Sequence, residues 1–223
     1  MTSALAHPTT GPAHHRAIVA VDIEGSSNRT NPAKARVRET MYDLVEQALD
    51  DAGITADRRD PLVDCGDGVL ALIHPVPEAP KALLLNRVIP TMRALLDDHG
   101  LMVPDEPLRL RAVVHAGEVH HDRRGCFGEA LDITFRLLNA PQFKARLNDS
   151  TAPLVVVVSD DIYRAVVRHG YEGIDPSGFT PNVRVRVAGE EHHGWVHVPA
   201  ARACRADLPR PHRRGLVALR GAE

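Results

Sequence analysis

The sequence has little cysteine, few aromatic side chains and almost no net charge. Its 223 residues include three cysteines and 4% aromatic residues, and 27 Lys and Arg oppose 29 Asp and Glu for a formal net charge of −2. Three scattered cysteines exclude a disulfide framework and a Cys-rich zinc site, so we expect Cys65 and Cys126 to pack as small apolar residues. The balanced charge gives no global attraction to nucleic acid, and we predict no nucleic-acid partner.

Long apolar runs are absent as well. No stretch approaches the ~18 apolar residues of a membrane span, and the first residues lack the apolar core of a signal peptide. We therefore expect a cytoplasmic protein without a membrane span. The 43% hydrophobic content suffices for one full core. We predict one domain over residues 16–198, a disordered segment over 1–15 and a basic mobile tail over 199–223.

Apolar periodicity predicts alternating strands and helices. We expect helices to begin at Pro32, with Asn31 as the N-cap, and at Ser159, which caps a short helix to Val167. Pro90 should kink the helix that contains it. The expected strands and hairpins span 16–22, 61–74, 108–115, 154–158 and 183–198, and the expected helices span 32–53, 81–98, 128–138 and 160–167. Together they predict an α+β fold with helices packed on a mainly antiparallel sheet.

Two short acidic segments carry most of the functional information. Asp22 follows the apolar run Ala17-Ile-Val-Ala-Val, and Asp67 lies in a Gly-Asp-Gly turn before a second apolar run. Neighbouring strands would bring both carboxylates to one sheet edge, at exposed turns. Mg²⁺ and Mn²⁺ prefer oxygen ligands, usually one or two carboxylates plus nucleotide phosphates. The turn Gly25-Ser26-Ser27 can present backbone N–H groups to a phosphate.

A third segment, Gly128-Glu-Ala-Leu-Asp132-Ile-Thr-Phe-Arg136, follows an apolar strand that ends in His-Ala-Gly-Glu. In this order, the three segments resemble the catalytic domain of the class III nucleotidyl cyclases, the adenylyl and guanylyl cyclase family. The resemblance covers about residues 16–198 and implies a ferredoxin-like core. It implies two divalent metal ions, Mn²⁺ or Mg²⁺, held by Asp22, the Ile23 carbonyl and Asp67. It also implies that Arg136 offsets charge on the reacting phosphate.

The resemblance further implies a shared site. In that family the metal aspartates come from one chain, and an asparagine and an arginine come from its partner. Asp132 stands at the asparagine position, which orients the ribose, and Arg136 at the arginine position. A chain that carries both sets would form two equivalent sites in a two-fold homodimer, with a nucleoside triphosphate as substrate.

Departures from the family pattern concern the base. Purine cyclases read their base with a lysine or glutamate four residues before the second metal aspartate, where this chain has Val63. The partner position, usually aspartate, threonine or cysteine, is Gly125, and the phenylalanine of the phosphate turn is replaced by Ser26. Because buried polar readers reject a wrong base far better than an apolar wall does, these changes argue against tuned recognition of adenine or guanine.

Three interpretations remain from the sequence. The first is a cyclase for UTP or CTP, similar to the short bacterial uridylate and cytidylate cyclases of antiphage signalling. The second is a purine cyclase with relaxed base recognition. The third is an inactive cyclase-like domain that binds a nucleotide or a protein as a regulator. Retention of Asp22, Asp67 and Arg136 favours the active interpretations, because an inactive domain has no physical reason to keep three charges directed at one cleft.

Overall fold

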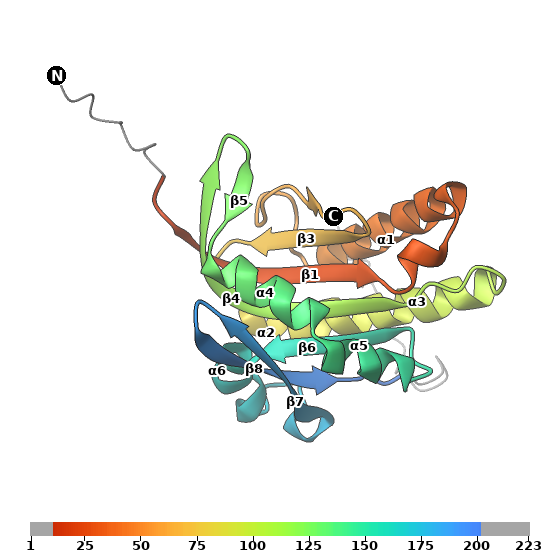
Figure 1. Ribbon diagram of the computed structural model, residues 1–223. Coiled ribbons are helices and arrows are strands. Elements are labelled where there is room, and N and C mark those ends of the chain that lie inside the picture. The colour runs from red at the N-terminus through yellow and green to blue at the C-terminus, as the bar shows by residue number, and fades with distance from the viewer. Residues whose placement is uncertain (1–10, 202–223) are drawn as a thin grey trace, which may run out of the picture.

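The computed structural model describes residues 11–201, which fold around one mixed sheet of eight strands (Figure 1). The strand order is β2-β3-β1-β4-β6-β8-β7, and β5 pairs with β4 outside this path. Only β4 and β6 pair in parallel among these strands. The strands are β1 His14–Ile23, β2 Val63–Asp64, β3 Gly68–Ile73, β4 Leu110–Asp122, β5 Gly125–Phe127, β6 Leu154–Ser159, β7 Phe179–Val187 and β8 Glu190–His197.

Helices cover both faces of the sheet, and the alternation of β1 shows which residues each layer buries. Val19 and Val21 pack in the cluster that contains α1 and α3, whereas Ile18 and Ala20 pack in the cluster that contains α4 and α5. Figure 1 shows α4 and α5 in front of the sheet and α1 and α3 behind it. The helices are α1 Asn31–Asp51, α2 Lys81–Leu83, α3 Ile89–Met102, α4 Glu129–Asn139, α5 Pro141–Asn148 and α6 Asp160–Ala165.

The N-terminal boundary of the domain differs from the one predicted from the sequence. β1 begins at His14, two residues before the predicted start of the domain, because its first residues pair with the far end of β4. Residues 1–10 of the predicted disordered segment, 1–15, and residues 202–223 of the predicted tail, 199–223, lie outside the described residues. No helix within 11–201 has both the length and the apolar character needed to cross a bilayer.

Two helix predictions need correction. The N-cap of α1 is Thr30 rather than Asn31, and its side chain makes no capping hydrogen bond; Pro32 lies in the first turn, where a missing N–H is tolerated. The helix predicted over 81–98 runs from α2 through a π-helical turn, η2 (Leu84–Val88), into α3 and ends at Met102. The π turn lies directly before Pro90, which offers no N–H to the preceding turn, so the helix adjusts there and continues.

The parallel pair β4–β6 requires a crossover, which contains β5, α4 and α5. The sequence analysis assigned no element to the residues of α5, although Phe143 and Leu147 have helical spacing and both are fully buried. Ser159 caps α6 as predicted, its Oγ accepting a hydrogen bond from the Ile162 N–H at 3.3 Å. Beyond α6 lie two short 3₁₀ turns, η3 (Val167–His169) and η4 (Pro176–Gly178).

The cysteine prediction is wrong for Cys65, which is exposed in the turn between β2 and β3. Cys126 is half-buried and packs against the cluster below α4, as predicted for a small apolar residue. The difference arises because β2 is only two residues long, so the chain leaves the sheet before Cys65 can reach a covered face.

His115, in the middle of β4, should make the fold less stable in mild acid. It is 2% exposed, and its Nδ1 shares a hydrogen bond of 2.8 Å with the Ser159 hydroxyl. Burial lowers the pKa of His115 from 6.5 to about 4. Between these values the unfolded chain binds the proton and the folded chain does not. The stability gained from keeping the ring neutral is therefore present above pH 6.5 and is lost as the pH falls toward 4.

We expect this group to lower the free energy of unfolding by about 2 kcal/mol between pH 7.5 and pH 5. His115→Gln keeps a polar partner for Ser159 and removes the titrating ring, so its stability should fall less over the same interval. Urea unfolding at the two pH values measures the difference. Equal losses in the variant and the parent would show that His115 titrates normally.

Candidate functional site

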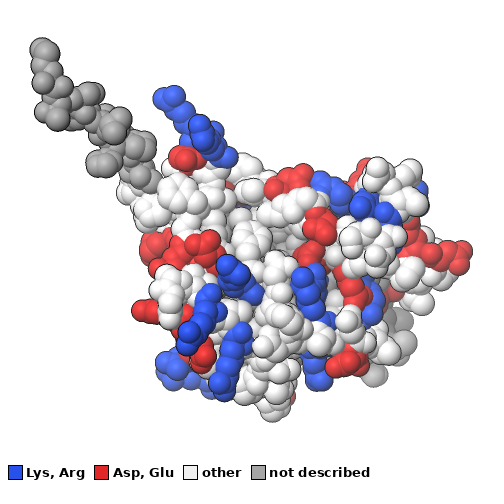
Figure 2. Space-filling model, viewed as in Figure 1, with Lys and Arg blue, Asp and Glu red and all other residues white. Residues whose placement is uncertain are grey.

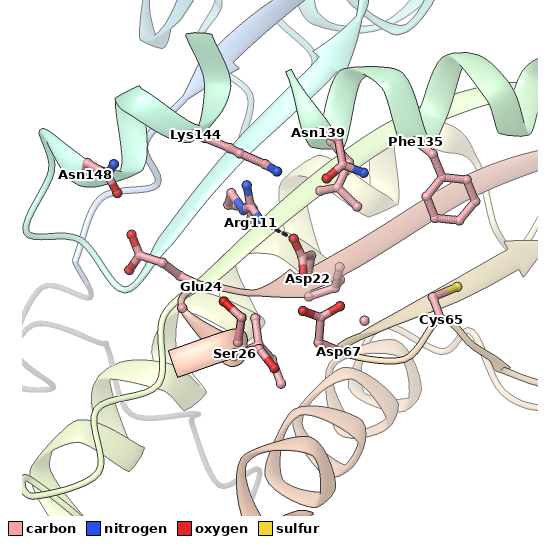
Figure 3. Close-up of a pocket in the computed structure, with 16 residues that line it drawn as sticks. Asp22, Glu24, Ser26, Cys65, Asp67, Arg111, Phe135, Asn139, Lys144 and Asn148 are labelled. Atoms are coloured by element: carbon pink, nitrogen blue, oxygen red, sulfur yellow. Dashed lines mark hydrogen bonds and ion pairs between the residues drawn. The ribbon is translucent and has the colours of Figure 1, made fainter. Parts of the chain in front are cut away.

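The end of β1 brings the two predicted aspartates together. Asp22 lies opposite Gly68 on β3, and the Ile23 N–H donates to the Asp67 carbonyl at 3.0 Å. A side chain at position 68 would place its Cβ 2.5 Å from the Val21 carbonyl oxygen, so glycine is required for this close approach. Asp22, Ile23 and Asp67 line one cavity of about 390 Å³. Figure 3 shows the two carboxylates side by side at its floor.

The turn that was predicted to bind phosphate lines the same cavity through Gly25, Ser26 and Ser27. Gly25 has φ 66°, a left-handed conformation that favours glycine, and it starts the 3₁₀ turn η1 (Ser26–Asn28). The first N–H groups of such a turn have no partner within it. Because the turn follows Asp22 directly, its N–H groups and the two carboxylates lie at the same end of the cavity.

Arg111 is a site residue that the sequence analysis missed. It lies directly opposite Asp22 in the β1–β4 pairing, its guanidinium forms an ion pair with that carboxylate, and it lines the cavity. The side chains of Asp22 and Arg111 are 13% and 10% exposed, so the prediction that Asp22 lies at an exposed turn is wrong. The buried Arg111 Nε has no hydrogen-bond partner within the described residues. The Arg111 guanidinium and the cavity that it lines suit an anion.

The charges explain why the site suits a divalent cation. Burial raises the pKa of Asp22, the neighbouring Asp67 carboxylate raises it further, and Arg111 and Lys144 partly oppose these effects. Two carboxylates that repel each other across a cavity are stabilised by a hard cation between them. No group of three or more His, Cys, Asp or Glu side chains within 11–201 is arranged to hold a metal. Further ligands would therefore be backbone carbonyl, phosphate or water oxygens.

Asp132 and Arg136 lie elsewhere. They line a second cavity of about 500 Å³, together with Arg186 on β7. Both cavities are lined by Phe135, which is half-buried, and Asn139, which is exposed, on α4. The fold of one chain thus places the predicted metal ligands and the predicted catalytic pair on neighbouring surfaces and does not bring them into one cavity.

The two predicted base-pocket residues line neither of these cavities. Val63 on β2 packs against the hydrophobic cluster under α4, and Gly125 is exposed at the start of β5. The Gly125 N–H donates to the Asp122 carboxylate at 3.0 Å, which closes the β4–β5 hairpin. The nearest cavity residues to Val63 along the chain are Cys65 and Asp67.

The cavity residues that were not predicted differ in how strongly the sequence indicates them. Arg111 is a charged residue within an otherwise apolar strand, Leu110 to Val114, which is itself a warning of a buried ion pair. Lys144 lies on α5, the helix that was not anticipated, and Arg186 lies on a strand with alternating arginines, where a solvent-facing edge is the ordinary interpretation. Only Arg111 carried a usable signal in the sequence.

Comparison with known proteins identifies the fold. No protein-family model and no curated protein sequence matches the chain. The guanylyl cyclase Cya2 is 17% identical, with a TM-score of 0.58 over 90% of this chain and 98% of that one. The adenylate/guanylate cyclase/hydrolase from Silicibacter pomeroyi is 19% identical, with a TM-score of 0.59 over 86% of this chain and 100% of that one.

A third solved structure is the catalytic core of a rhodopsin-guanylyl cyclase with converted specificity, in complex with ATPαS. It is 14% identical, with a TM-score of 0.54 over 86% of this chain and 99% of that one. The chain has the fold of the class III nucleotidyl cyclase catalytic domain, which confirms the predicted fold class. At these identities the likeness concerns the fold, and the activity has to be argued from the site.

Proposed function

We propose that this protein is a nucleotide cyclase that converts a nucleoside triphosphate to a 3′,5′-cyclic mononucleotide and pyrophosphate. The observation that carries the proposal is the cavity in which Asp22 and Asp67 face each other beside a buried arginine and a phosphate-facing turn. Paired carboxylates suit metal-bound phosphate, and the Arg111 guanidinium suits phosphate oxygens. This combination occurs here at one end of β1 in a cyclase fold.

Two divalent ions, Mn²⁺ or Mg²⁺, would be held by the Asp22 and Asp67 carboxylates with the Ile23 carbonyl. Such ions, when bound, favour loss of the 3′-hydroxyl proton and neutralise charge on the triphosphate. The chain itself supplies the frame: the β1–β3 pairing and the hydrogen bond from the Ile23 N–H to the Asp67 carbonyl bring the two carboxylates to one end of the sheet. Arg111 keeps Asp22 oriented through their ion pair.

The remaining groups act on the phosphates and the ribose. The N–H groups of the Ser26-Ser27 turn bind phosphate oxygens, and Arg111 contributes a guanidinium beside them. Arg136 offsets the charge that develops on the α-phosphate, because its planar fork matches phosphate oxygens. Asp132 accepts hydrogen bonds from ribose hydroxyls. The 3′-oxygen attacks the α-phosphorus in line, and the bond to the β-phosphate oxygen breaks as pyrophosphate leaves.

The cyclase is a homodimer with two composite sites. One chain provides the cavity with Asp22 and Asp67, and its partner provides the surface with Asp132 and Arg136. Figure 2 shows positive side chains gathered over α4 and β7, where Arg136, Arg184 and Arg186 are exposed. A cationic surface of this kind suits a cleft that must hold a triphosphate, and two-fold symmetry supplies it to both sites.

The base is a pyrimidine, with UTP preferred over CTP. The support comes from the sequence pattern: Val63 and Gly125 stand at the positions where the resemblance expects the polar base readers of purine cyclases, although neither residue lines the two cavities described above. The product would then serve as a second messenger in antiphage defence, as in the bacterial pyrimidine cyclases that the sequence resembles. A purine cyclase, the alternative, would have to accept its base with relaxed recognition, because a pocket without polar readers cannot select adenine or guanine strongly.

Separate reactions of the purified protein with ATP, GTP, CTP and UTP test the substrate. Mn²⁺ is the metal of choice, because it tolerates imperfect geometry better than Mg²⁺. We expect cyclic UMP as the main product, identified by mass. Exclusive conversion of ATP or GTP would replace the pyrimidine assignment and retain the cyclase. No product from any triphosphate, in a protein shown to be folded and dimeric, would favour a regulatory domain.

A further inference from the structure

We propose that Lys144 is a phosphate-binding residue, supplied to the triphosphate by the same chain that supplies Asp22 and Asp67. This inference rests on the proposed function, since it assigns a contact within the same site. Lys144 lines the cavity, and its charge is close enough to Asp22 to lower the pKa of that carboxyl. Figure 3 shows its side chain extending from its helix across the cavity toward Arg111 and Asp22.

The position of Lys144 is fixed by the packing of α5. Phe143, directly before Lys144, and Leu147, three residues after it, are both 0% exposed and pack in the cluster on this face of the sheet. Pro141 occupies the first turn, where its fixed φ favours the helical start. With one face of a short helix buried in this way, Lys144 is held on the face that borders the cavity.

A second contact ties α5 to the metal-ligand segment. The Arg109 guanidinium donates to the carbonyl of Leu147 and, at 2.6 Å, to that of Ser150, at the carboxyl end of α5. The same guanidinium forms an ion pair of 3.1 Å with Glu24, two residues after Asp22. Arg109 thus connects the helix that carries Lys144 to the end of the strand that carries Asp22, the predicted metal ligand. These contacts hold the helix in position relative to the strand end.

The local charges give Lys144 a ligand of defined chemistry. Arg111 is engaged with Asp22, and Arg109 with Glu24, whereas Lys144 forms no ion pair with any residue in the described range. Its ammonium group is therefore available to an incoming anion. A polyphosphate that extends from the Ser26-Ser27 turn across the cavity would meet Lys144 on the side opposite the two aspartates. The anion would then lie between the Lys144 ammonium group and the metal ions held by the aspartates.

Binding of inorganic tripolyphosphate in the presence of Mn²⁺, measured by calorimetry, tests this contact without requiring turnover. Lys144→Ala should weaken binding by about tenfold or more, as expected for loss of a charge-assisted hydrogen bond. Lys144→Arg should retain most of the affinity. Arg146→Ala removes an exposed cation from the same helix outside the cavity and should bind as the parent does.

Equal affinity of the Lys144→Ala variant and the parent would overturn the assignment, as would equal losses in the Lys144→Ala and Arg146→Ala variants, which indicate a general charge effect. An absence of tripolyphosphate binding by the parent would overturn it too. The proposed cyclase activity fails independently: a protein that binds tripolyphosphate through Lys144 and forms no cyclic product retains the phosphate contact and loses the cyclase assignment.

Discussion

Replacing Asp67 by alanine should reduce cyclase turnover roughly a hundredfold to a thousandfold or more, the range expected when charge stabilisation is lost at a reacting phosphate. The carboxylate is exposed, so its removal should leave the fold and its unfolding temperature nearly unchanged. Turnover with Mn²⁺ and thermal unfolding are measured on the same preparation. Asp43→Ala, which removes an exposed carboxylate from α1 far along the chain, serves as the control and should keep full activity.

Asp22 requires a different variant. Alanine at this position would leave the buried Arg111 guanidinium without its partner, and an uncompensated buried charge destabilises a fold by about 3–5 kcal/mol. Asp22→Asn keeps the shape and a hydrogen-bond acceptor, so it should lose turnover to a similar extent as Asp67→Ala with less damage to stability. A folded Asp22→Asn variant with parental turnover in Mn²⁺ would end the proposal that this carboxylate binds the metal.

Mixing two inactive proteins should restore activity if the site is shared between chains. An Asp22→Asn chain keeps Arg136, and an Arg136→Ala chain keeps Asp22, so a mixed dimer contains one intact site and one doubly altered site. Random exchange of equal amounts makes half of the dimers mixed, and about a quarter of the parental activity should return. The measurement is turnover before and after subunit exchange.

A matched mixture defines the negative control. Asp22→Asn and Asp67→Ala alter the same half-site, so every composite site formed from these two chains lacks one aspartate, and their mixture should stay inactive. If the Asp22→Asn and Arg136→Ala mixture also stays inactive after subunit exchange is demonstrated, then Arg136 does not act across a dimer interface.

The fold was largely predictable because its elements have strong local signals. The continuous apolar run from Ile18 to Val21 indicates a strand that is covered on both faces, and all four residues are buried in the structure. Asp22 follows such a run and Asp67 precedes another, so the two were predicted to lie close together. The β1–β3 register brings them to one end of the sheet. Periodicity and turn chemistry act over a few residues, and that is the range in which these predictions succeeded.

The remaining features depend on contacts between distant segments. Arg111 became a site residue only through its register opposite Asp22, which neither segment specifies alone. Lys144 could be placed only once helix α5 was known. The only sequence signal for this helix is two apolar residues, and they indicate a helix only when a sheet is present for them to pack against. The exposure of Cys65 depended on how soon β2 ends, and element boundaries are set by tertiary pairing more than by local preference.

The two aspartates are attached to parts of the fold that open at different free energies. β1 is paired with β4 from His14 to Ile23 on one side and with β3 from Ala17 to Asp22 on the other. Displacing Asp22 therefore requires a rupture of the central sheet, with a free energy near that of global unfolding. Asp67 lies in a turn that joins β3 to the two-residue strand β2, and such an edge opens locally. Amide hydrogen exchange should therefore be slow and cooperative for the strand around Asp22 and faster for the turn around Asp67.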